Sequence, residues 1–496
     1  MGWEYLFANP VTFLYIIGGV IMGLVFGAIP GLTATLAVVL ILPFTYMFTP
    51  EDGMATLIAV YVGGIAGGLI ASVLLNIPGS PAALVTCFDG SPMARNGRPA
   101  DALYLGVFSS AVGGMFSAVI LILLSSQMAK VALKFGAWEY FALGLFGLFI
   151  VVKLCSNDMK RGFISIIFGM VLAMAGMDPV LMNERLTYGV WQLGGGFPQI
   201  ATLMGLFALT EIYTQINKIH LKEKLQTVPV QKVSFLPSKG LLKGIWPNML
   251  RSSVIGTCIG ILPGVGQTTS SLLAYNQAKA ASKTPEIFGT GCKDGIVASE
   301  SANNACCGGA LIPMLSLGIP GDTVTSILLG GLMIHGMSPG PMLFRDHQNI
   351  IGAVFIVFII ANLLMFVLEI GLMKAFIRVL TSPINFLFPI IILMCVVGSF
   401  TANSRVFDCY IFLFIGFVGY LLNSIGFTLS PIVLGYILGP IIENNWRVAM
   451  IANRGNPLSI LTHPIAYGFI LVGLLVLFWP QVKRLFSSLR KKRQAA

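Results

Sequence analysis

Residues 260–275, GILPGVGQTTSSLLAY, join an apolar helical pattern to a break in its middle. Pro263 and Gly264 interrupt the helix within a segment apolar enough for a membrane, and four polar residues follow: Gln267, Thr268, Thr269 and Ser270. Backbone groups that such a break leaves unpaired are tolerated within a membrane only where protein or a water-filled cavity satisfies them. The stretch therefore predicts a broken transmembrane helix that lines a cavity.

The same arrangement occurs three more times along the chain. GAIPGLTATLAV, residues 27–38, supplies Pro30, Gly31, Thr33 and Thr35. NIPGSPAA, residues 76–83, supplies Asn76, Pro78, Gly79 and Ser80, and a serine followed by proline is typical of an N-cap and first helical residue. LGIPGDTV, residues 317–324, supplies Pro320, Gly321, Asp322 and Thr323. Paired interrupted helices in corresponding halves of a chain indicate the binding site of a secondary transporter.

The composition is that of a membrane protein. Hydrophobic residues make up 56% and charged residues 10% of the 496 residues, with a mean hydropathy of +0.87. Soluble domains carry roughly 25% charged residues. Apolar segments long enough to cross a hydrocarbon core of ~30 Å recur along the chain. Two helical regions surround the breaks of the second half, at about 245–281 and 298–331. The other segments lie at about 11–28, 32–48, 54–75, 102–126, 137–152, 162–177, 197–217, 350–373, 384–402, 409–427, 431–442 and 463–480. These segments predict an all-α polytopic membrane protein.

The net charge of +11 is concentrated in two places, a linker at 218–250 and a tail at 481–496. An excess of Lys and Arg marks cytoplasmic segments, so both are expected in the cytoplasm, and no nucleic-acid partner is expected. The linker divides the chain into a first transmembrane repeat, 1–217, and a second, 251–480. The eight cysteines contain no CxxC pair, so neither a transition-metal site nor a disulfide framework is expected.

Charges at the ends of the two main hairpins differ in sign. The first hairpin lies between Glu4 and the pair Glu51 and Asp52, whereas its counterpart in the second half lies between basic segments. Under the positive-inside bias this places the hairpins on opposite faces of the membrane, although acidic residues contribute little to orientation. We therefore expect two structurally repeated halves in an inverted arrangement, with their interrupted helices meeting near the midplane.

The helices that leave the four breaks predict an anion site. Each begins with unpaired N–H groups and the positive end of its dipole, which attract anions. The side chains there are neutral donors, among them Thr33, Ser80, Gln267 and Thr323. Neutral donors suit an anion that must be bound and then released. The alternative is that these residues only cap their own helices.

Glu300, Asn303 and Asn304 share one face of an otherwise apolar helix because they stand at i, i+3 and i+4. Burying such groups without partners costs several kcal/mol, so an ionisable residue there indicates function. Their oxygens are suited to Na⁺ or to a proton, and Asp322 is a second candidate. The alternatives are a solvated loop near Lys293 for the first three residues and a plain N-cap for Asp322.

At GAIPGLTATLAV, NIPGSPAA, GILPGVGQTTS and SESANNACCGGALIPMLSLGIPGD the sequence resembles the large membrane subunit of the bacterial tripartite tricarboxylate transporters, over essentially the whole chain. The resemblance implies a permease of the inner membrane that imports citrate or a related carboxylate by symport with Na⁺ or H⁺. It also implies two partners, a small membrane subunit of about four helices and a periplasmic solute-binding protein. Cys306 and Cys307 depart from the small residues usual in the family.

Two other classes of function remain open at this stage. A channel or a structural membrane subunit would also tolerate the breaks, but it has no need of coupling to a gradient. An intramembrane enzyme needs a catalytic pair facing each other at membrane depth, and the sequence offers none that is compelling. The stretch GVGQTTS lacks the lysine of a phosphate-binding loop, so the expected driving force is an ion gradient and no other cofactor is expected.

Overall fold

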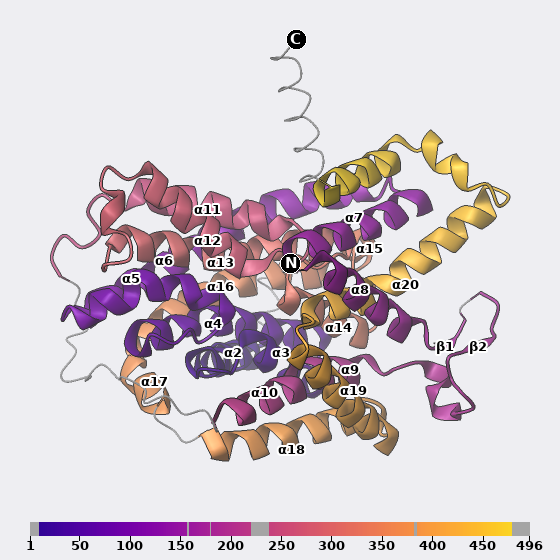
Figure 1. Ribbon diagram of the computed structural model, residues 1–496, viewed down its shortest axis with the longest axis horizontal. Helices are drawn as coiled ribbons and strands as arrows, with labels where there is room; N and C mark the ends of the chain where they lie inside the picture. The colour runs from indigo at the N-terminus through magenta and orange to yellow at the C-terminus, as the bar shows by residue number, and fades with distance from the viewer. Residues whose placement is uncertain (1–8, 156–157, 179, 220–237, 381–383, 479–496) are drawn as a thin grey trace, which may run out of the picture. The chain divides into compact units, whose positions relative to one another are not determined.

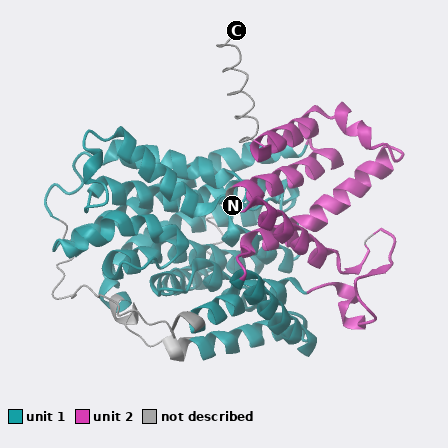
Figure 2. Ribbon diagram, viewed as in Figure 1, with its two compact units in different colours: residues 1–133, 198–424 teal, residues 134–197, 425–496 magenta. Residues whose placement is uncertain are grey.

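The computed structural model describes residues 9–155, 158–178, 180–219, 238–380 and 384–478. These residues form two compact units, coloured in Figure 2. Unit 1 contains residues 1–133 and 198–424, and unit 2 contains residues 134–197 and 425–496. Unit 1 therefore contains the Pro-Gly breaks of both halves of the sequence. The prediction of a largely helical chain is confirmed (Figure 1).

Unit 1 is built from helices of both sequence halves. The first half contributes α2 (Pro10–Ala28), α3 (Ala34–Thr45), α4 (Pro50–Leu75), η1 (Pro81–Ala83), α5 (Leu84–Arg95), α6 (Pro99–Ala132), α9 (Gln199–Met204), the π-helical turn η3 (Gly205–Leu209) and α10 (Thr210–Ile219). The second half contributes α11 (Trp246–Ile261), α12 (Gly266–Ala281), η4 (Pro285–Ile287), α13 (Lys293–Leu317), α14 (Thr323–Ile334), α15 (Pro341–Asp346), α16 (Gln348–Gly371), α17 (Met373–Leu380), α18 (Ile384–Asn403) and α19 (Val406–Ser424).

Unit 2 contains α7 (Ala137–Cys155), α8 (Met159–Met174), β1 (Gly176–Met177), β2 (Glu184–Arg185), η2 (Trp191–Gly195), α20 (Leu429–Ala452), η5 (Pro457–Thr462) and a last helix, Pro464–Phe478. The two short strands pair antiparallel. Asp178 closes their turn: the backbone amides of Leu181 and Val180, with the Arg447 guanidinium, hold the pKa of its carboxyl at about 2. Arg185 bonds Glu443 at 2.6 Å, so α20 is tied to the hairpin by ion pairs.

Five described helices are long and apolar enough to cross a membrane, judged by length and composition: α2, α4, α6, α16 and α19. Three predicted segments have different bounds. The segment 162–177 ends as a helix at Met174 because Gly176 and Met177 form β1. The segment 197–217 is divided by the π-helical turn. The segment 431–442 extends to Ala452 because α20 continues through Pro440, and its polar residues Glu443 and Arg447 are ion-paired.

Each half contains two helix interruptions. α2 ends at Ala28 and α3 begins at Ala34, while α11 ends at Ile261 and α12 begins at Gly266. Gly31 and Gly264 have φ of +89° and +71°, a left-handed conformation that favours glycine because it has no Cβ. The second interruption separates α4 from η1 in one half and α13 from α14 in the other.

Glycines bring the helices of each half together in matching ways. A methyl group on Gly23 of α2 would collide with the carbonyl of Val60 on α4, and one on Gly256 of α11 would collide with the carbonyl of Ala302 on α13. One turn later, Gly27 faces the Gly64 carbonyl and Gly260 faces the Cys306 carbonyl.

In each half, the second helix interruption packs against the first through a glycine that lies against a backbone carbonyl. Gly79 lies against the carbonyl of Gly27, and Gly321 lies against the carbonyl of Gly260. Small residues allow such close backbone approach between membrane helices. The two halves thus use the same packing at corresponding positions.

We expect Gly23→Ala to destabilise the protein, since the added methyl group would meet backbone atoms of α4 that have no room to move. Overpacking of this kind costs about 1–3 kcal/mol. Gly18→Ala, on the same helix, is the matched control because its Cβ would meet no atom within 4 Å. The measurement is thermal unfolding of both purified variants, and equal melting temperatures would contradict the packing described here.

Candidate functional site

Asp322 lies at the centre of a buried polar cluster in unit 1. It is the N-cap of α14, and its carboxylate accepts from the backbone N–H of Thr325 at 2.6 Å in a capping box. Its other oxygen, Oδ2, accepts from the hydroxyl of Tyr61 on α4 and from the amide of Gln267 on α12. The Gln267 amide also donates to the Tyr61 hydroxyl at 2.8 Å. The cluster therefore connects Gln267, which follows the first helix break of the second half, with Asp322, which follows the second break of that half.

The residues after Gln267 have different surroundings. Thr268 is exposed and Thr269 is half-buried. Ser270 and Ser271 are buried, and their hydroxyls donate to the carbonyls of Ala302 at 3.0 Å and Ser299 at 3.1 Å. Two serines thus attach α12 to the polar part of α13, while the two threonines point away from that contact.

The residues at the breaks of the first half differ in their surroundings. Thr33 is the N-cap of α3 and accepts from the N–H of Leu36 at 3.2 Å, so it caps its own helix. Ser80 occupies the N-cap position of η1 but makes no capping bond, and its buried hydroxyl has no partner among the described residues. Asn76 is exposed at the end of α4, in the left-handed region with φ +56°.

Within the second half, Pro263, Gly264, Pro320 and Gly321 are buried, whereas Thr323 is half-buried. In the first half, Gly79 is buried, and Pro30, Gly31, Thr35 and Pro78 are half-buried. The Pro-Gly breaks thus lie largely inside unit 1 and not on its rim. The structure brings Gln267 and Asp322 into contact; the substrate residues predicted in the first half are not among their hydrogen-bond partners in the described chain.

Glu300 lies on α13 with no exposed surface. Its Oε1 accepts from the hydroxyl of Thr86 on α5, and its Oε2 accepts from that of Ser110 on α6 at 2.9 Å. The alternative of a solvated loop is wrong for this residue, because Glu300 lies in the middle of a buried helix. Two hydroxyl donors from the first half hold a carboxylate of the second half.

Asn303 and Asn304 follow Glu300 on α13 and are both about 1% exposed. Neither the nitrogen nor the oxygen of the Asn303 amide has a hydrogen-bond partner among the described residues, and the same holds for the side-chain oxygen of Asn304. The Asn304 amide nitrogen donates to the Glu300 carbonyl at 3.4 Å. Buried polar groups without partners are uncommon in proteins, so these oxygens are available to a ligand.

Sequence reasoning missed several polar partners. Tyr61, Thr86 and Ser110 supply donors to the two carboxylates, but each stands alone in a largely apolar segment and carries no local signal. Asp89 on α5 was also missed. Its Oδ1 accepts from the backbone N–H groups of Gly289, Gly291 and Cys292, which ties the first half to the connection between α12 and α13.

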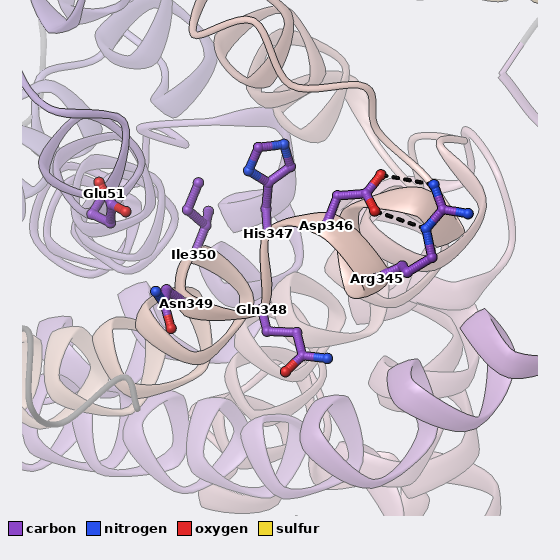
Figure 3. Close-up of a pocket in the computed structure, with 7 residues that line it drawn as sticks. All are labelled: Glu51, Arg345, Asp346, His347, Gln348, Asn349 and Ile350. Atoms are coloured by element: carbon purple, nitrogen blue, oxygen red, sulfur yellow. Dashed lines mark hydrogen bonds and ion pairs between the residues drawn. The ribbon is translucent and has the colours of Figure 1, made fainter.

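A polar surface pocket of about 420 Å³ lies elsewhere in unit 1 (Figure 3). It is lined by Glu51 at the start of α4 and by Arg345 to Ile350, between α15 and α16. Arg345 and Asp346 form an ion pair at 2.7 Å within it. None of the residues predicted from the sequence lines this pocket, so it is separate from the two carboxylate clusters.

One family profile matches the chain, and two relatives are similar to it. The profile of the Tripartite tricarboxylate transporter TctA family matches residues 13–434. The "Uncharacterized 52.8 kDa protein in TAR-I ttuC' 3'region" of Agrobacterium vitis is 34% identical over 486 residues, which cover 98% of this chain and 95% of that protein. The "Uncharacterized protein in TAR-II ttuC' 3'region" of the same organism is 34% identical over 238 residues, 48% of this chain and 97% of that protein. No solved structure matches.

Proposed function

The chain belongs to the tripartite tricarboxylate transporter TctA family, and from this premise we propose that it is the large membrane subunit of a secondary active carboxylate importer. Its substrate is citrate or a related tri- or dicarboxylate, and its driving force is a gradient of Na⁺ or H⁺. A small membrane subunit and a periplasmic solute-binding protein complete the system in the bacterial inner membrane, with the basic tail in the cytoplasm. The tail lies outside the described residues.

The observation that carries the proposal is the buried cluster of Asp322, Gln267 and Tyr61. A buried carboxylate at one helix interruption, held by an amide from another, attracts a cation within a unit of membrane-length helices. The matching glycine contacts of the two halves support the repeat, and the signs of the flanking charges support its inverted arrangement.

The carboxylate substrate binds at the helix ends that leave the breaks. The N-terminus of α12 has no side-chain cap, so its N–H groups and the positive end of its dipole attract an anion without a fixed positive charge, whereas Thr33 and Asp322 cap α3 and α14. The residues proposed to contact it are those after Pro30, Pro78, Pro263 and Pro320. Thr268 and Thr269 have the accessibility that such contact requires.

The coupling cation binds at Glu300, Asn303, Asn304 or Asp322. Carboxylate and amide oxygens are the ligands that hard cations prefer. The unpartnered amide oxygens of Asn303 and Asn304 lie on the same helix face as Glu300, which supports this part of the proposal. Neutralising a buried carboxylate with a cation also lowers its repulsion of an anionic substrate, which gives a physical reason for coupling.

The test is uptake of labelled citrate into proteoliposomes that contain the chain with its two partners. We expect accumulation against a concentration gradient when an inward Na⁺ or H⁺ gradient is imposed, and loss of accumulation when ionophores dissipate it. Citrate flux that only equilibrates across the membrane would instead identify a channel. No flux with any di- or tricarboxylate would refute the proposal.

We expect the double variant Thr268→Val, Thr269→Val to raise the KM for uptake roughly 100-fold or more, because hydrogen bonds to a charged ligand are worth about 1.5–3 kcal/mol each and two are lost. Valine keeps the shape of threonine, so the protein should still fold. The control is Thr462→Val, an exposed threonine of unit 2. Unchanged uptake kinetics in the double variant would remove both residues from the substrate site.

A further inference from the structure

A further buried carboxylate of unit 1 belongs to none of the clusters above. Glu369 lies near the end of α16 and has no exposed surface. Neither Oε1 nor Oε2 has a hydrogen-bond partner among the described residues. It continues the buried face of α16 formed by Phe358, Asn362 and Met365. The described residues around it thus offer no hydrogen-bond donor to a negative charge.

Burial is the main obstacle to a negative charge on Glu369, and the carboxylate of Glu300, which has the same sign, adds to it. α6 lies between the helices that carry them: Gly113 is against the Ser301 carbonyl of α13, and Gly114 is against the Asn362 amide of α16. The two acids are therefore unequal. Glu300 has hydroxyl donors from Thr86 and Ser110, whereas Glu369 has none.

The elements packed against α16 are α2, α4, α6, α15 and α17, and no described side chain of theirs forms a hydrogen bond or an ion pair with Glu369. Tyr15 of α2 stacks on Phe48, and Tyr61 of α4 donates to Asp322. Among the described side chains, the remaining groups are at helix ends, paired or exposed: Glu51 and Asp52 on α4, Asp101, Tyr104 and Lys130 on α6, Arg345 and Asp346 on α15, and Lys374 on α17. A buried carboxylate without a partner becomes neutral by taking up a proton.

We propose that Glu369 is a proton-binding site of the transport cycle, which takes up and releases one proton in each turn of the cycle. The inference rests on the proposed function, because it names the ion that this site moves. The O–H bond of the Glu369 carboxyl breaks when the site opens to the cytoplasm, the proton passes to water, and the carboxylate is protonated again from the outer side.

The link between the two acids gives the proton a role in coupling. Neutralisation of Glu300, by a cation or by its own proton, removes a negative charge that adds to the effect of burial in favouring a proton on Glu369. By reciprocity, a proton on Glu369 changes the affinity of Glu300 for a cation by the same factor. A proton gradient acting on Glu369 therefore changes the state of the site around Glu300.

The first measurement needs no substrate. The infrared spectrum of the purified chain in lipid at pH 8 should contain the C=O stretch of a protonated carboxylic acid. The band should be missing from Glu369→Gln and shifted in Glu369→Asp, which keeps an acid at the site if the glutamine variant fails to fold. Glu139→Gln, in unit 2, is the control that should keep the band. Identical bands in wild type and both Glu369 variants would overturn the proposal.

The second measurement uses the complete transporter in proteoliposomes with labelled citrate. Accumulation driven by a pH gradient should fall at least tenfold in Glu369→Gln, and the pH dependence of its uptake should be flat, because glutamine cannot exchange a proton. Wild-type accumulation in that variant, or accumulation in the wild type driven by Na⁺ with no effect of a pH gradient, would overturn the inference and leave the proposed function standing. Absence of gradient-driven uptake in the wild type would instead contradict the proposed function, while the infrared band still decides whether Glu369 holds a proton.

Discussion

Asp322→Asn should nearly abolish gradient-driven uptake while the protein remains folded. Asparagine is as good an N-cap as aspartate, so α14 should still begin at Thr323. The substitution removes the negative charge and places the Nδ2 donor where Oδ2 accepted from Tyr61 and Gln267. Because no charge then remains for the coupling cation, we expect uptake to fall roughly 100-fold, which corresponds to the loss of about 3 kcal/mol of cation binding.

Uptake of labelled citrate under an imposed gradient measures this effect, with the elution profile of the purified variant as a check on folding. Asp346→Asn is the matched control, because Asp346 is exposed on α15 and paired only with Arg345 there. If Asp322→Asn transports like the wild type, Asp322 is only a helix cap. The capping alternative would then be sufficient for this residue.

Glu300→Gln should have the other large effect. Glutamine has the size of the glutamate side chain, so the contacts of α13 with α5 and α6 should be kept. Its amide nitrogen, however, cannot accept from Thr86 or Ser110, and no charge remains for a cation. We expect accumulation of citrate to fall roughly 100-fold, which corresponds to the loss of about 3 kcal/mol of cation binding.

Glu300→Ala separates coupling from stability. It leaves the hydroxyls of Thr86 and Ser110 without their acceptor, and each unsatisfied buried group costs about 1–3 kcal/mol. This variant should therefore unfold at a lower temperature than Glu300→Gln. Glu286→Gln, on the exposed turn η4, should match the wild type in both measurements. Normal accumulation in Glu300→Gln would exclude Glu300 from the coupling site.

Local pattern was sufficient for much of the architecture. Apolar segments of membrane length predicted the helices, and the Pro-Gly pairs marked the positions where α2, α4, α11 and α13 end. The family resemblance, based on the same four motifs, is confirmed by the match over residues 13–434. The predicted bounds were wrong where long-range contacts override local pattern: α20 continues beyond its apolar part, where Glu443 pairs with Arg185 and Arg447 pairs with Asp178.

Only part of the candidate site could be predicted from local sequence patterns. Glu300 and Asp322 could be identified because an acid in an apolar segment is conspicuous. Glu369 is just as acidic, but it stands near the end of its segment, where a charged residue usually lies in solvent. Only its burial in unit 1 distinguishes it.

Local sequence patterns were therefore sufficient to predict the helices, their breaks and the family, because hydrophobic periodicity and proline act over a few residues. The partners of the two carboxylates could be known only from the folded chain. Tyr61 lies 261 positions from Asp322, and Thr86 lies 214 positions from Glu300. The physical reason is that a buried charge takes its donors from whichever helices pack around it, and no pattern within one helix records which helices those are.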